Sequence, residues 1–419
     1  MTTNPPDPVT AAARSRAVNL AVIVAALGYF VDIYDLILFT IIRVPSLRDL
    51  GVTDAAMLNE GAFILSMQMG GLLIGGLLWG ILGDRYGRLS VLFGSIVLYS
   101  LGNIANGFVH STTAYAVVRF ITGIGLAGEL GAGITLVSEV MRKESRGYGT
   151  TIVASVGLCG ALVAAMVGEQ THWRTSYFIG GGLGIALLAL RVGVLESGMW
   201  AQTKHKSIGR GNFLILFSTA SRMRRYLGII LVGVPVWYVI GILIAFCPEI
   251  GKSLGMIEPP KTSRAVFFSY AGLVLGDIAS GFASQLIRSR KKVLAAALMA
   301  TVVSTAAYFL VGPKSLNLFY AMCVALGISV GYWSVFVTVA SEQFGTNIRA
   351  TVTTTVPNFV RGAVIPLTFA FTLGKEFLGI PGSAIAVGVV TLAIAFVALR
   401  SIEETYGKDL DFIEMRSNQ

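Results

Sequence analysis

Two aspartates in the first long apolar segment are the residues of this chain best suited to proton chemistry. Asp32 and Asp35 are three positions apart, so they lie on one face of a helix. Two neighbouring carboxylates cannot both ionise at low cost, so such a pair can bind and release a proton near neutral pH. We therefore expect at least one of them to couple a proton to function. The alternative is that one aspartate only pairs with Arg119.

Four further ionisable residues fall inside apolar segments, where a charge costs about 2.5–3.5 kcal/mol. Glu129, which is flanked by glycines, is a candidate proton site or a partner for Arg119. Arg361 is expected to clamp an anionic substrate, because a guanidinium binds a carboxylate in a two-point geometry. Asp277 is expected either to couple protons or to pair with Arg361. The alternative for Arg361 is a structural pair with Asp277 or Asp32.

Polar aromatic and amide side chains in the middle of the apolar segments can line a cavity, although packing is the commoner role of such a residue. Together with the two arginines they make up the candidate substrate-binding set. That set is Arg361, Arg119, Tyr29, Gln68, Trp237, Tyr238, Tyr332, Trp333 and Asn358.

The composition indicates that membrane-spanning helices position these residues. Charged residues make up 13% of the 419, against roughly 25% in an average globular protein, whereas hydrophobic residues make up 54%. The 49 glycines suit close helix contacts in lipid. This composition excludes an ordinary cytosolic enzyme, a disordered chain and a secreted disulfide scaffold.

A spanning helix needs about 20 mainly apolar residues. The chain offers twelve such segments, and the first is too long for the core of a signal peptide. We therefore predict an all-α membrane protein with twelve transmembrane helices. Their expected ranges are 17–42, 59–82, 89–109, 113–140, 148–168, 176–196, 226–250, 264–287, 292–312, 316–341, 350–374 and 382–400.

The distribution of Lys and Arg predicts the orientation. With the N-terminus inside, cytoplasmic segments hold 21 of the 32 and opposite segments hold 8, including Arg43. This excess places both termini in the cytoplasm. The expected organisation is a cytoplasmic tail (1–16), a six-helix bundle (17–196), a basic cytoplasmic linker with an amphipathic stretch (197–225), a second six-helix bundle (226–400) and a cytoplasmic tail (401–419).

Two sequence features recur at an offset of about 200 residues. The loop after the second segment, from Gly80 to Arg88 (GILGDRYGR), has a counterpart that begins at Gly281, 201 positions later. Glu139 and Arg146 recur as Glu342 and Arg349, 203 positions later. Two similar offsets at matching helix ends indicate a duplicated bundle, the architecture in which transporters hold a site between two halves.

The loop motif G-x-L-x-D-R-x-G-R resembles that of the major facilitator superfamily. The resemblance implies that the loop charges pair across helix ends and stabilise one conformer of an alternating-access cycle. The residues assigned to this conformational gating are Gly80, Asp84, Arg85, Gly87, Arg88, Glu139, Arg146, Glu342 and Arg349.

Three further segments are similar to symporter branches of that family. The fourth segment, from Arg119 to Glu129 (RFITGIGLAGE), resembles the metabolite:proton symporter branch. The first, from Gly28 to Leu36 (GYFVDIYDL), resembles metabolite and phosphate symporters, and Arg191 with Glu196-Ser197 resembles the sugar and metabolite branches. In the second loop copy, Gln285 stands where the family often has Asp. Glu129-Leu130-Gly131 departs from the acidic-Tyr-Pro sequence of the phosphate branch, which disfavours phosphate as the substrate.

We therefore expect a secondary active transporter, not an enzyme, that moves a small carboxylate metabolite with protons by alternating access. The alternatives are a proton-antiport exporter of drug-like or cationic compounds, an inorganic phosphate symporter and a non-transporting membrane receptor. No phosphate-binding loop or metal-ligand cluster is present in the sequence, so we expect no cofactor. The expected partners are the substrate, protons and the bilayer, without nucleic acid. The protein is expected to be a monomer in the inner membrane of a prokaryote.

Overall fold

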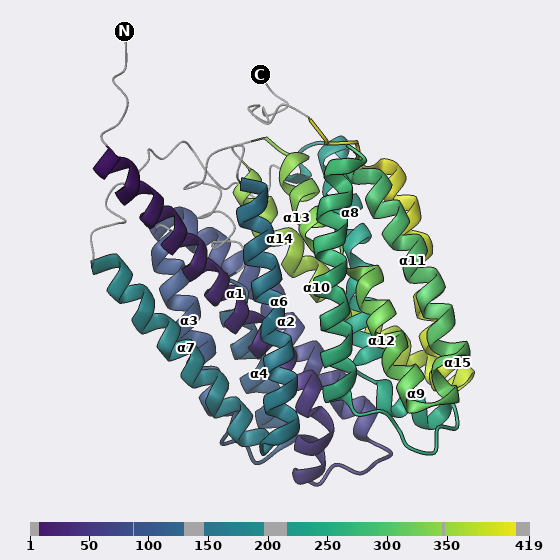
Figure 1. Cartoon of the computed structure of the whole chain (residues 1–419). Helices are drawn as coiled ribbons and strands as arrows, with labels where there is room; N and C mark the ends of the chain where they lie inside the picture. Colours follow the sequence, from purple (N-terminus) through teal and green to yellow (C-terminus); the bar gives the residue numbers. More distant parts are fainter. Residues whose placement is uncertain (1–7, 87, 130–145, 197–215, 346–347, 408–419) are drawn as a thin grey trace.

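The computed structural model of the chain describes residues 8–86, 88–129, 146–196, 216–345 and 348–407. These residues form helices and short connections, and none of them forms a strand. Figure 1 shows the helices side by side in an elongated bundle, with both chain ends at the same end of it. The expected all-α fold is confirmed.

Six helices precede the gap at 197–215, and each corresponds to one predicted span. Their bounds are α1 Pro8–Asp49, α2 Met57–Tyr86, α3 Arg88–Asn106, α4 Thr112–Leu126, α6 Arg146–Gln170 and α7 Trp173–Glu196. Most of the predicted fourth span beyond α4, residues 130–140, lies outside the described residues, as does most of the stretch 211–221 predicted to be amphipathic.

The second half of the chain contains more and shorter elements than were predicted. They are α8 Ala220–Tyr238, the π-helix η3 Val239–Ile244, α9 Cys247–Ser253, α10 Thr262–Leu286, α11 Arg290–Leu310, the 3-10 turn η4 Gly312–Lys314, α12 Leu316–Val330, α13 Trp333–Glu342, α14 Arg349–Gly362 and α15 Val364–Ser401.

Nine helical spans in the described part of the chain are long and apolar enough to cross a membrane. One of them, Thr351–Ser401, has 51 residues and contains the last two predicted helices, which are separated at Gly379, where φ is 69°. Two shorter apolar helices, Val91–Asn106 and Thr112–Leu126, correspond to the third and fourth predictions. The described spans therefore account for all twelve predicted helices.

The tenth predicted helix, 316–341, is wrong as a continuous element. Its helical path ends at Val330 and resumes as α13 at Trp333. The backbone of Gly331 packs directly against Gly276 of α10 at this point. A close contact with a neighbouring helix therefore interrupts a sequence that is apolar throughout.

Two other predicted helices, 226–250 and 350–374, are also interrupted. The first changes to the π-helix η3 after Tyr238 and then restarts as α9, which has Pro248 in its first turn. The second breaks at Ala363. Pro366 lies four residues after Gly362 and has no N–H to donate to its carbonyl, which accounts for the second break.

Glycines allow the helices of the first half to pack backbone to backbone. A Cβ atom on Gly71 of α2 would collide with the Phe120 carbonyl of α4, and one on Gly123 of α4 would collide with the Gln68 carbonyl of α2. Such close contacts replace the hydrophobic driving force that is missing between helices in lipid.

Helices from the two halves of the chain meet along the middle of the bundle. α2 packs against α14 and α15, and α6 packs against α10, while α1 also contacts α10. The exact boundaries of the two six-helix units stay a prediction. The interface matters for function because it brings α1 and α14, which carry Asp32 and Arg361, together.

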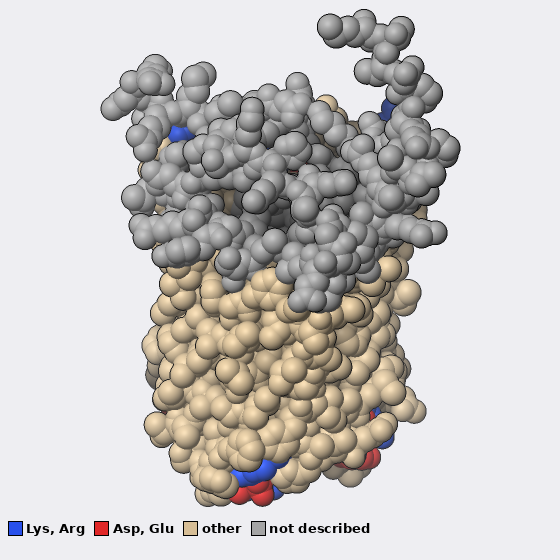
Figure 2. All heavy atoms as spheres, turned by 90° about the vertical axis from the view of Figure 1, so that its left-hand side faces the viewer, with Lys and Arg blue, Asp and Glu red and all other residues tan. Residues whose placement is uncertain are grey.

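The outer surface of the bundle is apolar. Figure 2 shows a face whose middle is free of Lys, Arg, Asp and Glu, with charged side chains at the end away from the chain termini. Large apolar side chains such as Phe63, Leu101, Val303 and Phe377 are exposed on this surface. Since a soluble protein rarely exposes so continuous an apolar surface, this is a multi-pass membrane protein.

Candidate functional site

A buried ion pair joins the two halves of the chain. Nη2 of Arg361 on α14 lies 3.4 Å from Oδ2 of Asp32 on α1, and both side chains are shielded from solvent. Nε and Nη1 of Arg361 and Oδ1 of Asp32 have no hydrogen-bond partner. The guanidinium therefore keeps donors free for another acceptor. Of the two structural alternatives weighed for Arg361, the one in which it pairs with Asp32 is observed.

The neighbours of Arg361 fix its position on α14. Asn358, one turn earlier, donates its Nδ2 hydrogens to the carbonyls of Ala127 (3.1 Å) and Thr354 (3.0 Å), and the first of these bonds ties α14 to α4. Gly362 packs against Leu73 of α2 without room for a Cβ atom. Predicted residue Asn358 therefore holds the helix that presents the arginine.

Tyr29 connects this ion pair to a second polar group. It lies one turn before Asp32 on α1 and interacts electrostatically with Asp32, Arg361 and Asp277, while its hydroxyl lies beside Trp333. The predicted residues Tyr29, Asp32, Arg361, Asp277 and Trp333 are thus brought together at the interface of the halves.

Tyr270 belongs to the same cluster and was not predicted. It lies on α10 within electrostatic range of Tyr29, Asp32 and Arg361. A signal for it was present in the sequence, because Tyr270 precedes Asp277 by seven residues, or two helical turns, and so shares its helix face.

Asp277 is placed by the break between α12 and α13. Its Oδ1 accepts the backbone N–H of Ser334 at 2.7 Å, in the first turn of α13, whereas Oδ2 has no partner. The expected pair between Asp277 and Arg361 does not form, because the arginine lies against Asp32 instead. The indole Nε1 of Trp333 is likewise buried without a partner.

A second polar cluster lies inside the first half. Arg119 on α4 donates to the backbone carbonyl of Asp35 and to Oδ1 of Asn103, both at 3.2 Å, and its guanidinium lies 5.3 Å from the ring centre of Tyr177. Both carboxylate oxygens of Asp35 are buried without a hydrogen-bond partner. Asp35 therefore has different surroundings from Asp32, although the two are one turn apart.

Glu129 pairs with Arg191 of α7 and not with Arg119, so the alternative in which Glu129 is a partner for Arg119 is wrong. Nη1 of Arg191 donates to Oε2 of Glu129 at 3.0 Å, and Nη2 forms a second bond to Oε1. Gly28 of α1 packs directly against this pair. The place of Arg191 inside an apolar segment was the signal that it needed a buried partner.

The remaining predicted side chains do not join the cluster around Tyr29. Gln68 donates to the Leu36 carbonyl (2.9 Å), Tyr238 to that of Ala384 (3.0 Å) and Tyr332 to that of Val232 (2.9 Å). Each of these bonds ties two helices together. Trp237 is buried in α8 and makes no hydrogen bond to the cluster.

Comparisons with known proteins agree with this architecture. The sequence profile of the Major Facilitator Superfamily matches residues 20–368. The chain belongs to this superfamily. It is therefore a membrane transporter, as expected, and not an enzyme.

Two curated relatives of this superfamily member match nearly its full length. The sialic acid transporter NanX of Escherichia coli is 27% identical over 89% of this chain and 92% of its own. The niacin transporter NiaP of Acinetobacter baylyi is 25% identical over 93% and 95%. A solved structure of the proton:xylose symporter XylE covers 95% of this chain with a TM-score of 0.71 at 15% identity, which confirms the fold.

In this transporter a second buried ion pair joins the two halves near the end away from the chain termini (Figure 1). Nη1 and Nη2 of Arg43 on α1 each lie 2.8 Å from an oxygen of Glu249 on α9, and Nη2 also donates to the Ala245 carbonyl at 3.1 Å. Arg43 is fully buried and lies 4.7 Å from the ring centre of Phe246. Its assignment to a connecting loop was wrong, because α1 continues to Asp49.

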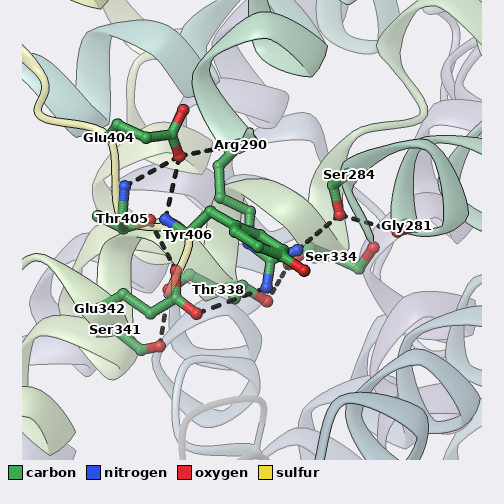
Figure 3. A network of polar contacts seen from close by, with 10 residues as sticks. All are labelled: Gly281, Ser284, Arg290, Ser334, Thr338, Ser341, Glu342, Glu404, Thr405 and Tyr406. Atoms are coloured by element: carbon green, nitrogen blue, oxygen red, sulfur yellow. Dashed lines mark hydrogen bonds and ion pairs between the residues drawn. The ribbon is translucent and has the colours of Figure 1, made fainter. Parts of the chain in front are cut away.

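At the opposite end, the C-terminal segment contacts the start of α11 and the end of α13 (Figure 3). Arg290 lies 3.6 Å from Glu342, and Thr405 donates to the same carboxylate at 2.6 Å. The Tyr406 ring lies 5.4 Å from the guanidinium of Arg290. Predicted gating residue Glu342 is therefore part of a charged network, and its described ion-pair partner is Arg290.

Glu404 binds the start of α11. It accepts the Ser289 hydroxyl hydrogen and the backbone N–H groups of Arg290 (2.9 Å) and Lys291 (3.2 Å). Burial raises the pKa of Glu404, but hydrogen bonds from the Ser289 hydroxyl and from the backbone N–H groups of Tyr406, Arg290 and Lys291 outweigh it and lower the pKa to about 2. Glu404 therefore provides a negative charge beside the second copy of the loop motif, in which Gln285 stands where the family often has Asp.

The other predicted gating residues are only partly visible. Arg349 donates to the carbonyls of Ser341 (3.0 Å) and Phe344 (3.3 Å), and Gly80 has open space around its Cα. The rest lie outside the described residues: Gly87 and Glu139 entirely, and Asp84, Arg85, Arg88 and Arg146 as far as their side chains are concerned.

Proposed function

We propose that the protein is a secondary active transporter that carries a small organic carboxylate together with a proton. The observation that carries this proposal is the buried Asp32–Arg361 pair at the interface of the two halves, in which the arginine has two unpaired nitrogens. Such a pair is suited to exchange one carboxylate for another.

The proposed coupling follows from the cost of burying an unpaired charge. An isolated guanidinium in a low-dielectric interior costs several kcal/mol, so Arg361 needs a carboxylate beside it at every stage. When Asp32 takes up a proton, its charge disappears and the guanidinium becomes available. A substrate carboxylate then replaces Asp32 as the partner, through two-point hydrogen bonding. Release of the substrate restores the Asp32–Arg361 pair as Asp32 loses its proton.

The other buried carboxylates have secondary roles in this proposal. Asp35, with two unpaired oxygens beside Arg119, is placed to pass protons between Asp32 and the end away from the termini. Glu129 is held by Arg191 and belongs with the structural contacts of the first half. The substrate side is formed by Arg361, Tyr29 and Trp333.

The proposed cycle alternates access from the two ends of the bundle. The Arg43–Glu249 pair closes one end between the halves, and the network around Glu342 occupies the other. The excess of Lys and Arg near the termini supports a cytoplasmic location for both of them. We propose a monomer in the inner membrane of a prokaryote.

The substrates for which the relatives are named support a carboxylate as the substrate of this protein. The two full-length relatives are named for sialic acid and niacin, which are both carboxylic acids. These names alone do not select a substrate for this chain, so the argument rests on Arg361.

The proposal is tested by uptake into proteoliposomes with an inward proton gradient, with benzoate and butyrate as carboxylates and benzamide as a neutral analogue. Arg361→Ala should lower carboxylate uptake by about 30-fold or more, because it removes one partner of a buried charged contact. Asp32→Asn should keep exchange of substrate across the membrane but lose proton-driven accumulation. Arg174→Ala, which removes a partly exposed arginine paired with Asp49, is the control.

A second variant separates loss of substrate binding from misfolding. Arg361→Ala leaves Asp32 buried and unpaired, whereas the double variant Arg361→Gln with Asp32→Asn keeps the volume without charge. If this double variant is folded and still accumulates carboxylates, the proposal is wrong. Uptake of lipophilic cations in exchange for protons, unaffected by Arg361→Gln, would favour an exporter instead.

A further inference from the structure

Two chemically different poles lie within electrostatic range of Tyr29. Arg361 has two unpaired nitrogens, which are hydrogen-bond donors. Asp277 has an unpaired Oδ2, which is an acceptor. Tyr29 is within electrostatic range of both, so the two poles belong to one site.

The acceptor at Asp277 is held in a fixed orientation. Its other oxygen accepts the Ser334 N–H at 2.7 Å, and the start of α13 packs against α10 through Gly331 and Gly276. Within the described part of the chain no Lys or Arg forms an ion pair with Asp277. A fully buried carboxylate oxygen without a partner is costly, so a donor from a ligand or a water is expected there.

Three other side chains of this cluster are flat rings. Tyr29, Tyr270 and Trp333 are almost fully buried, and the Trp333 ring lies 5.2 Å from that of Phe336. Aromatic rings make their best contacts with other planar groups, either stacked or edge to face. The surroundings therefore favour a planar ligand over a flexible aliphatic one.

We propose that the substrate is an aromatic carboxylate with a hydrogen-bond donor, such as a hydroxyl or amino group, on the ring edge away from the carboxylate. This inference rests on the proposed function, in which Arg361 binds the carboxylate. Asp277 accepts the hydrogen bond from the donor group, and Tyr29, Tyr270 and Trp333 contact the ring. A site built to pair with a donor discriminates strongly against an analogue without one, because its own polar group is then left unpaired.

The test is isothermal titration of the full-length protein in lipid nanodiscs with benzoate, 3-hydroxybenzoate, 4-hydroxybenzoate and butyrate. At least one hydroxybenzoate should bind about tenfold or more tightly than benzoate, and benzoate more tightly than butyrate. Asp277→Asn should lower the affinity of the preferred hydroxybenzoate while that of benzoate changes by less than about threefold. The amide oxygen of Asn can still accept the Ser334 N–H, so this variant should fold.

A second variant and a distinct set of outcomes keep the inference separate from the proposed function. Trp333→Phe retains a ring next to Tyr29 and leaves Asp277 unchanged, so the hydroxybenzoate preference should persist. If butyrate binds as tightly as the aromatic acids, or if Asp277→Asn weakens every carboxylate equally, the inference is wrong and the carboxylate function stands. If no carboxylate binds and Arg361→Gln changes nothing, the proposed function itself is wrong.

Discussion

At the scale of single residues, the charges buried in this transporter divide into two kinds. Glu129 and Arg191 satisfy each other through two bonds, as a fixed structural pair does. Asp32 and Arg361 touch through one contact of 3.4 Å and leave several atoms unpaired. We infer that the second kind of pair is the one that opens and closes, because less interaction energy is lost when it separates.

Gly28 offers a test of the fixed pair. A Cβ atom at this position would collide with Oε1 of Glu129 and Nη2 of Arg191. Gly28→Ala should therefore lower the stability of the folded protein by about 1–3 kcal/mol, the usual cost of overpacking a buried site. Thermal unfolding in detergent measures the effect. Gly182→Ala is the matched control, since nothing lies within 4 Å of a Cβ atom there. Equal melting temperatures for the two variants would contradict the prediction.

At the scale of helices, the sequence predicted the existence of the elements better than their continuity. Length and apolar composition are enough to place a spanning helix, and all twelve have counterparts among the described helices. The break at Gly331 depends on a glycine contact with a helix more than fifty residues away, which no local pattern contains. The extension of α1 past Arg43 is of the same kind, because a buried arginine there requires Glu249 from the other half.

The candidate site shows the same limit. Burial of Asp32, Asp35, Glu129, Asp277 and Arg361 follows from their place in apolar segments, since each must avoid lipid. Their pairing depends on how the helices are rotated about their axes. From the sequence, Arg361 therefore had two possible structural partners and Glu129 had Arg119 as its one possible partner, whereas in the structure Arg361 pairs with Asp32 and Glu129 with Arg191.

The C-terminal segment allows a prediction on pH dependence. The pKa of Glu404 is lowered from 4.5 to about 2, so its ionised form is favoured when the segment is docked. Docking should therefore be fully stabilised above pH 4.5 and weaken as the pH falls towards 2. The protection of residues 402–406 against hydrogen exchange, taken relative to the intrinsic exchange rate at each pH, should fall over this window in the natural protein. Glu404→Gln should show low protection throughout. An identical pH profile for both proteins would rule out this role for the carboxylate.

At the scale of the whole molecule, we expect closure of one end to depend on the contact between Arg43 of α1 and Glu249 of α9. Glu249→Gln removes the charge that Arg43 needs, so the equilibrium should shift towards a state open at this end. Cys247, fully buried beside the pair, reports the change. In a protein with Cys159→Ser and Cys323→Ser, its reaction with an impermeant maleimide should accelerate by between about 5-fold and 150-fold.

The control for this experiment is a solvent-exposed ion pair at the same end. Arg48 and Asp54 lie 3.4 Å apart with most of both side chains in solvent, and exposed pairs contribute little. Asp54→Asn should leave the labelling rate of Cys247 unchanged. If Asp54→Asn and Glu249→Gln have the same effect, net charge at the surface and not the buried contact controls closure.

The proposed exchange of carboxylates at Arg361 would also determine what can drive accumulation of the substrate. A monoanion that enters with one proton adds no net charge to the membrane crossing. A voltage of about 100 mV, which gives about 2.3 kcal/mol for each elementary charge moved, then does no work on the cycle. Only the pH difference counts, and each unit of it permits about tenfold accumulation of the anion. A cell in neutral surroundings would gain little from such a carrier, whereas one in acidic surroundings would concentrate scarce organic acids.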